Sequence, residues 1–470
     1  PTTAYVALAG TAEVALVDLR QRKVTNRIGV GRWPRSLALS PDESRLAVGT
    51  SGDQSVSIVD TERGELLYQE SVGGLNLGHM QTSADGQYVY FPWMVYRHNP
   101  ITAANIRKGW VLGSRVARVR LDGPARREAI TLDPPGVAVA DPHGLAVSRD
   151  ERTLVVAASG THELLVFGVP KLRFVDYGGP GDHIERNLLA DRDNFYRIEL
   201  GGRPMAVRLS GDGHRTFVAN WLTNAVQIVD LDARKVTASI PLGSSPHPSL
   251  ARQGAATFYD GRRSLDQWYS CHSCHYDGGA NSEPMDTKND RSLLTFKTVP
   301  SLVGATRTGP WTWHGWQTDL DDAMRVSITE TMLGPPPSPD DCRALVAFLA
   351  TLDNPPNPYR APDGSLSPAA ERGRSVFHSA TAGCAACHTG PEFTDGKIHD
   401  VGLGSPKDAL DGFNTPSLLG VYRRVRWLHD GRAKSLEQLL TGPHDPAKVT
   451  GSGSLTDAER SDLIEYLKSL

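Results

Sequence analysis

The sequence predicts a multidomain β + α protein, in which an N-terminal β domain precedes two α-helical domains. Three observations support this prediction. Residues 1 to about 250 contain short runs that alternate between polar and apolar side chains, as half-buried strands do. From Leu250 onward the apolar residues recur at helical spacing instead. The helical part carries one pattern twice, so we expect domains at residues 1–250, 251–357 and 366–470.

The β domain carries an internal repeat that consists of an alternating strand, a turn, a second apolar strand and then a Ser-x-Asp-like turn. Its copies read SLALSPDESRLAV (36–48), MQTSADGQYVYF (80–91), GLAVSRDERTLVV (144–156) and AVRLSGDGHRTFV (206–218). Strands and turns at this spacing are typical of four-stranded blades and predict a β-propeller. The pattern resembles the YVTN type of propeller, to which Phe217-Val218-Ala219-Asn220 is a close local match. About five units are clear, and the number of blades stays open.

A second pattern lies at the start of the predicted inner strands. The residue after a proline is Arg35, His143, Met205 or His247, and His79 lies one place out of register. Inner strands of a propeller begin near its axis, so three histidines and a methionine there could hold copper or another borderline metal. Hydrogen-bonded channel residues are the simpler interpretation, which the sequence favours.

The strongest motif is C-x-x-C-H, which occurs twice. Cys271-His272-Ser273-Cys274-His275 and Cys384-Ala385-Ala386-Cys387-His388 account for four of the five cysteines. In this motif the two thiols attach haem c and the histidine binds its iron. The alternatives are a zinc site built from both cysteine pairs and a redox dithiol. Because both pairs carry the histidine, we expect two covalent haems in two all-α, cytochrome c-like domains.

The two helical domains align with each other. Val299-Pro300-Ser301-Leu302-Val303-Gly304 repeats as Thr415-Pro416-Ser417-Leu418-Leu419-Gly420, and Trp313-His314-Gly315 aligns with His429-Asp430-Gly431. Each copy ends in a capped helix, which follows Ser338 in the first and Thr456 in the second. The fifth cysteine, Cys342, lies on the apolar face of the first of these helices and is expected to be a structural thiol.

Composition limits the remaining classes of function. The net charge of -3 gives no basic footprint for nucleic acid, and no apolar run is long enough to span a bilayer. Haem c is attached outside the cytoplasm, so we expect a mature periplasmic chain whose leader has been removed.

At the C-terminus the chain resembles a known family. The segments CAACHTGPEFTD (384–395), FNTPSLLGV (413–421) and LHDGRAKSLEQLL (428–440) are similar to the second haem domain of the bacterial di-haem cytochrome c peroxidase and MauG superfamily. The resemblance is strong over 366–470, more divergent over 252–352 and absent from the β domain. It implies that one haem reacts with hydrogen peroxide while a six-coordinate haem relays electrons. The implied partner is a small cytochrome c, a cupredoxin or a protein substrate.

For the second haem, the resemblance implies His388 as the proximal ligand and a distal Met after the HDG motif. No Met occurs from Leu333 to Leu470, whereas His444 lies next to the expected place. We therefore expect a bis-His haem held by His388 and His444. His429 matches a histidine that does not bind iron in the family, and Tyr422 is a weaker alternative because MauG uses a Tyr ligand. A second imidazole in place of a thioether makes the haem harder to reduce.

For the first haem, the resemblance implies His275 as the proximal ligand. Family peroxidases often carry a distal His before the Trp motif, but none lies between His275 and His314. We therefore expect an iron that is open to peroxide. Trp313 occupies the family's Trp position between the haems, which suits electron transfer, and His314 replaces an Asp.

Two further features follow from the resemblance. Glu330 lies near the family's pocket Glu and could move the peroxide proton, although a solvated helix carboxylate is an equal alternative. The family places calcium between the haems, but Thr298 stands where an Asn is expected, which argues against this ion.

These observations favour a peroxide-using di-haem oxidoreductase whose propeller docks a partner or substrate. One alternative is a di-haem electron-transfer protein. Another is a propeller that senses a metal or ligand, with the cytochromes as its readout.

Overall fold

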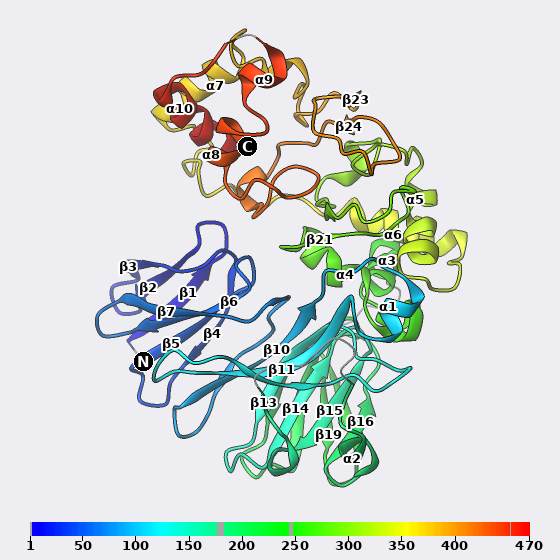
Figure 1. Ribbon diagram of the computed structural model, residues 1–470. Helices are drawn as coiled ribbons and strands as arrows, with labels where there is room; N and C mark the ends of the chain where they lie inside the picture. The colour runs from blue at the N-terminus through cyan, green and yellow to red at the C-terminus, as the bar shows by residue number, and fades with distance from the viewer. Residues whose placement is uncertain (1, 176–182, 244–247, 452) are drawn as a thin grey trace. The chain divides into compact units, whose positions relative to one another are not determined.

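The computed structural model describes residues 2–175, 183–243, 248–451 and 453–470 (Figure 1). The chain divides into two compact units. The first contains the residues up to Cys274 together with Met332–Pro335, and the second contains His275–Thr331 and Pro336–Leu470. Sheets dominate the first unit and helices the second, which confirms the order β then α. The boundaries at 250, 357 and 366 stay predictions.

Five antiparallel sheets follow one another along the first unit. They contain β1 (Thr3–Leu8), β2 (Glu13–Asp18) and β3 (Lys23–Gly29); β4 (Pro34–Leu39), β5 (Arg45–Thr50), β6 (Ser55–Asp60) and β7 (Glu65–Ser71); β8 (Gly74–Leu75), β9 (Gln81–Thr82), β10 (Tyr88–Tyr96), β11 (Leu112–Arg120) and β12 (Glu128–Thr131); β13 (Pro142–Val147), β14 (Thr153–Ala158), β15 (Glu163–Gly168) and β16 (Phe195–Glu199); β17 (Pro204–Leu209), β18 (Arg215–Asn220), β19 (Ala225–Asp230) and β20 (Lys235–Pro241). Three sheets have the predicted four strands. The first has three, and the third has five because β8 and β9 both pair with β10.

One turn recurs in four of these sheets. Its Ser hydroxyl donates to the Asp two residues later, at 2.5–2.6 Å, in the pairs Ser40–Asp42, Ser83–Asp85, Ser148–Asp150 and Ser210–Asp212. Short polar side chains that bond locally in this way stabilise tight turns. The Ser-x-Asp turn read from the sequence is therefore the structural unit of the repeat.

Three inner strands carry the same β-bulge. The register shifts between Pro34 and Ser36 in β4, and the residue between them has no partner in the ladder. The same shift brackets His143 in β13 and Met205 in β17. A bulge re-aims the side chain of its extra residue. Three of the residues that follow a proline in the repeat, Arg35, His143 and Met205, are thus bulge residues.

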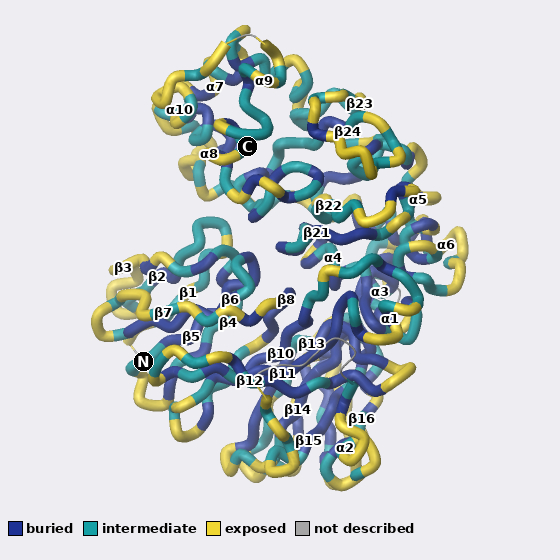
Figure 2. Tube along the Cα trace, in the orientation of Figure 1, coloured by how far each residue is buried: buried dark blue, intermediate teal, exposed yellow. Residues whose placement is uncertain are grey.

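Each sheet packs on the next one along the chain, through the pairs β1 with β4, β4 with β9, β10 with β13 and β13 with β17. Apolar side chains fill these contacts, as where Val14 and Ile28 of the first sheet meet Val48 of the second. Figure 2 shows that the interior strands, such as β10 and β14, are buried along most of their length. Successive propeller blades pack in this order. No closed ring of sheets is found in the described part of the chain, so the propeller itself stays a prediction.

Short helices complete the first unit. They are α1 (Ala103–Arg107), η1 (Val169–Lys171), α2 (Arg186–Ala190), α3 (Leu250–Phe258), η2 (Gly261–Arg263), η3 (Leu265–Gln267) and α4 (Cys271–Cys274). The first C-x-x-C pair therefore lies in the same unit as the sheets.

The second unit repeats one set of elements. The first copy contains η4 (Tyr276–Gly278), β21 (Pro284–Met285), β22 (Lys297–Thr298), η5 (Ala305–Arg307), α5 (Leu320–Val326), the π-helical turn η6 (Ser327–Thr331) and α6 (Pro339–Leu349). The second contains α7 (Pro368–Phe377), η7 (Cys384–Ala386), β23 (Ile398–His399), β24 (Phe413–Asn414), η8 (Val421–Arg423), α8 (Leu436–Thr441), α9 (Pro446–Thr450) and α10 (Asp457–Lys468). Thr312 and Leu428 both adopt a φ of 71°, and Trp311 and Trp427 form equivalent bridges. The alignment of the two copies is confirmed.

The closing helices begin as predicted. Capping boxes pair Ser338 with Asp341 at α6 and Thr456 with Glu459 at α10. Cys342 is 5% exposed within α6, which agrees with a structural thiol. Among the described helices, none combines the length and apolarity needed to cross a bilayer.

Candidate functional site

The histidines of the two C-x-x-C-H motifs are held in the same way. His275 Nδ1 donates to the carbonyl of Pro300 at 3.0 Å, and His388 Nδ1 donates to that of Phe393 at 3.1 Å. Burial lowers the pKa of both histidines to about 4, so each is a neutral imidazole at pH 7. A histidine fixed through Nδ1 offers Nε2 to a metal, and the bond to the carbonyl raises its basicity. Both histidines therefore fit as ligands of a haem iron.

The motif cysteines are neutral thiols. All five cysteines of the chain are free of disulfides. Burial raises the pKa of Cys271 and Cys274 to about 12, and that of Cys384 to about 11. A redox-active C-x-x-C pair has a lowered thiol pKa instead. This disfavours the redox dithiol and suits cysteines that are consumed in covalent attachment.

Residues from the sheets hold the loop of the first motif. Ser270 and Ser273 donate their hydroxyls to the two carboxylate oxygens of Asp141, at 2.5 and 2.6 Å, and all three side chains are buried. Asn76 donates to the carbonyl of Ser273 at 2.8 Å. The thioether of Met332 lies 3.8 Å from Cys271 Sγ. These contacts could not be predicted from the sequence, because the partners lie far apart along the chain.

His444 lies close to the second motif. It follows α8, where its backbone N–H donates to Leu439, and burial lowers the pKa of its imidazole. After burial, electrostatic repulsion from His444 also lowers the pKa of His388. Within the described residues, the buried His444 Nδ1 has no hydrogen-bond partner. A buried polar atom without a protein partner points to a ligand. His444 fits the predicted sixth ligand, although this role stays a prediction.

Replacing His444 with alanine is expected to convert the second haem from low spin to high spin, because one strong-field imidazole is lost. Electron paramagnetic resonance of the ferric protein measures the change. His378→Ala is the matched control, because His378 is an exposed histidine of the same domain. An unchanged low-spin signal in His444→Ala would transfer the ligand role to His429 or Tyr422.

The two alternative ligands have other neighbours. The His429 ring stacks on Phe413 with centroids 4.0 Å apart, and burial lowers its pKa to about 4. The ring of Tyr422 contacts Tyr359 at 5.6 Å, and burial raises its pKa.

Trp313 bridges the two copies of the helical domain. Its indole N–H donates to the carbonyl of Thr298 at 2.6 Å, and its own carbonyl accepts from the backbone N–H of Asn414 at 2.7 Å. Its ring centroid lies 6.4 Å from that of His429. Trp313 therefore touches both the first and the second copy, as its predicted role between the haems requires.

His314 belongs to a buried cluster of charges. Its Nδ1 donates to Gly412 at 2.8 Å, and its Nε2 lies 3.9 Å from Asp290 and 3.8 Å from Asp408. Lys297 Nζ binds the same two carboxylates, at 2.7 and 3.0 Å. Burial alone would raise the pKa of both aspartates, but the Lys297 ammonium holds it below the usual range.

The calcium ion implied by the family does not fit this region. The positive charge between the two carboxylates is the Lys297 ammonium. The carbonyl of Thr298 accepts from Trp313, and its hydroxyl donates to Leu428 at 2.9 Å. A calcium ion requires several free oxygen ligands. His314, whose part the sequence could not explain, packs between this charge cluster and Phe413.

The remaining predicted residues are only partly brought together. Glu330 is exposed on η6, as the solvated alternative expects, and its catalytic role stays a prediction. The His79 and His143 rings lie 4.6 Å apart, and His143 Nδ1 donates to the carbonyl of Met205 at 2.9 Å. His247 lies outside the described residues. Metal binding by this group stays a prediction, and the group of metal-ligand type found among the described residues is Cys387, Asp395 and His399.

Both C-x-x-C-H motifs carry two free thiols and a histidine fixed through Nδ1, as the covalent attachment of haem c requires, which defines a haem c-binding protein of the cytochrome c type. Residues 370–470 match the cytochrome c family. The hydrazine synthase gamma subunit of Kuenenia stuttgartiensis is 28% identical to the chain, over 48% of this chain and 79% of its own length. Methylamine utilization protein MauG of Methylorubrum extorquens is 26% identical, over 51% and 85%. Cytochrome-c peroxidase IdrP2 of Denitromonas iodatirespirans is 22% identical, over 51% and 86%.

These relatives confirm the resemblance to the di-haem cytochrome c peroxidase and MauG proteins. They also confirm that the chain is related to oxidoreductase enzymes. Each relative matches only about half of the chain.

Proposed function

We propose that the chain is a periplasmic di-haem c oxidoreductase that uses hydrogen peroxide at its first haem and relays electrons through a six-coordinate second haem. The observation that carries this proposal is the position of Trp313, which contacts both copies of the helical domain. The relatives named as a cytochrome c peroxidase and as MauG support the same class of reaction.

Haem c, when bound, supplies a redox-active iron at each site. The chain's part is to hold and orient it. His275 is fixed by Pro300 and would bind the first iron, while His388 and His444 would bind the second. No histidine lies between His275 and His314, so no histidine of that segment would compete with peroxide for the first iron. Glu330 would pass the peroxide proton between the two oxygens.

The partner is a small cytochrome c, a cupredoxin or a protein substrate, and the sheet unit is the docking domain in this proposal. If the sheets form a propeller, they would together present one surface to which the partner could dock. A copper ion at His79 and His143 is a further element, supported by the 4.6 Å separation of their rings.

The alternative is a di-haem electron-transfer protein without peroxide chemistry. A second haem bound by His388 and His444 would be closed to substrates, which fits this function as well as the first. The state of the first haem therefore decides between the two functions.

The diferric protein is expected to react with hydrogen peroxide directly, and both haem spectra should change. Trp313→Ala should slow the spread of oxidising equivalents to the second haem, because it removes the ring beside His429. Stopped-flow absorbance spectroscopy measures both steps. Trp311→Ala is the matched control, since Trp311 bonds to Ala305 within the first copy. If both ferric haems are low-spin and peroxide changes neither spectrum, even after partial reduction, the protein is an electron-transfer protein and the peroxide-using function is wrong.

A further inference from the structure

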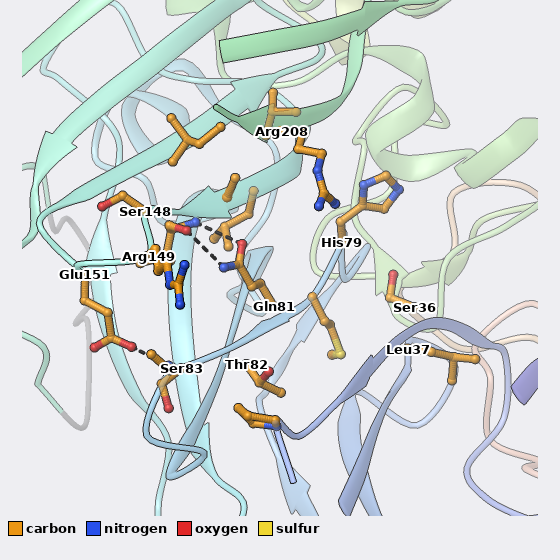
Figure 3. Close-up of a pocket in the computed structure, with 18 of the residues that line it drawn as sticks. Ser36, Leu37, His79, Gln81, Thr82, Ser83, Ser148, Arg149, Glu151 and Arg208 are labelled. Carbon is orange, nitrogen blue, oxygen red and sulfur yellow. Dashed lines mark hydrogen bonds between the residues drawn. The ribbon is translucent and has the colours of Figure 1, made fainter. Parts of the chain in front are cut away.

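The first unit contains a cavity of about 670 Å³ between the inner strands of four sheets. Residues of β4, β9, β13 and β17 line it, together with the Ser-x-Asp turns that follow these strands (Figure 3). Small-molecule sites typically have volumes of about 300–1,000 Å³. The proposed haem chemistry uses no residue of this wall. One lining residue, His79, was considered above as a copper ligand.

The hydrogen-bond acceptors of the wall are already used. Gln81 bridges β9 and β13, because its carbonyl oxygen accepts from the Val147 N–H and its amide donates to the Val147 carbonyl, both at 3.0 Å. Glu151 accepts from the Ala84 N–H at 2.6 Å. Figure 3 draws the hydrogen bonds of Gln81 and of Glu151 as dashed lines in the cavity wall. Glu151 is the one acidic side chain among the lining residues.

Two of the donor groups of the wall, in contrast, have no such partner. Arg149 and Arg208 line the cavity and are exposed to solvent. In the described part of the chain, neither guanidinium has a hydrogen bond or an ion pair to another side chain. Arg35 adds a third guanidinium to the lining. In Figure 3 the Arg208 side chain extends towards His79, and Arg149 lies on the other side of Gln81.

The wall is therefore rich in cationic donors and poor in free acceptors. Guanidinium groups bind carboxylates and phosphates through charge-assisted, bidentate hydrogen bonds. Three arginines against one glutamate leave an excess of positive charge that a small anion would neutralise.

We propose that this cavity binds a small molecule with more than one oxyanion group, such as a phosphorylated compound or a di- or tricarboxylate. Arg149 and Arg208 come from different sheets, so one ligand with two acidic groups can engage both. The carboxylate of Glu151 would repel a negatively charged ligand and so weaken its binding. The proposal is independent of the haem chemistry.

Isothermal titration calorimetry of the intact, haem-loaded chain tests the proposal, with inorganic pyrophosphate and citrate as ligands. We expect at least one of them to bind, and more weakly at higher ionic strength. Arg149→Gln and Arg208→Gln should each weaken binding about tenfold, as expected for the loss of a hydrogen bond from a charged donor. Glu151→Gln should tighten binding, because it removes the one negative charge. Pyrophosphate alone would indicate a phosphorylated ligand, and citrate alone a carboxylate.

Arg152→Gln is the matched control, because Arg152 lies in the same turn but does not line the cavity. Its affinity should equal that of the unchanged protein. The proposal is overturned if neither compound binds at low ionic strength. It is also overturned if the Arg149→Gln, Arg208→Gln double variant binds as well as the unchanged protein, or if Arg152→Gln weakens binding equally.

Discussion

Replacing Lys297 with methionine is expected to lower the free energy of unfolding by about 3–5 kcal/mol, the cost of removing one partner from a buried ion pair. Lys297 Nζ lies 2.7 Å from Asp290 and 3.0 Å from Asp408, and the lysine side chain is 12% exposed. Without the ammonium, two carboxylates remain side by side in the interior, with His314 Nε2 3.9 Å from Asp290 and 3.8 Å from Asp408. Denaturant unfolding followed by haem absorbance measures the loss.

The size of this effect should depend on pH. The folded-state pKa of Asp290 and of Asp408 lies below the usual range, so their stabilising contribution is present above the unfolded pKa of about 4. It is lost as the pH falls through the folded value. The difference between Lys297→Met and the unchanged protein should therefore shrink in acid. Lys288→Met, at an exposed lysine nearby, is the control and should be within about 0.5 kcal/mol of the unchanged protein. Equal effects of the two substitutions would contradict the prediction.

Replacing Asp141 with alanine should destabilise the first unit by about 3 kcal/mol, because two buried hydroxyls each lose their acceptor. Ser270 is 1% exposed and Ser273 is fully buried, so water does not replace the carboxylate. The absorbance and spin state of the first haem should change, while those of the second should not. Asp141→Asn keeps one acceptor oxygen and should have a smaller effect.

The control for this substitution is Asp150→Ala, which removes an aspartate that binds a serine hydroxyl in an exposed turn. It should leave both haem spectra as they are. A change in the second haem of Asp141→Ala, or no change in the first, would count against a local role for Asp141.

Features that repeat along the chain, or whose residues have a fixed spacing, could be predicted from the sequence. The Ser-x-Asp turns, the aligned helical copies and the two capping boxes all depend on residues a few positions apart, which local chemistry determines. The bond between Asp141 and Ser273 joins residues 132 positions apart, and the pair of Lys297 with Asp408 spans 111. Such contacts leave no periodic signal. For the same reason the contacts of His314 could not be predicted, although its position in the repeat was clear.

The bulges of β4, β13 and β17 distinguish residues that pair with the neighbouring strand from a residue that does not. In each strand the ladder resumes one residue after the extra one, so the bulge residue has no partner on the neighbouring strand. Arginine, histidine and methionine occupy equivalent places at 35, 143 and 205 without changing the strand around them. Such places can exchange their chemistry while the scaffold stays intact. Proteins built on this repeat could therefore acquire new specificities by single substitutions there, and a designer could alter these three side chains first.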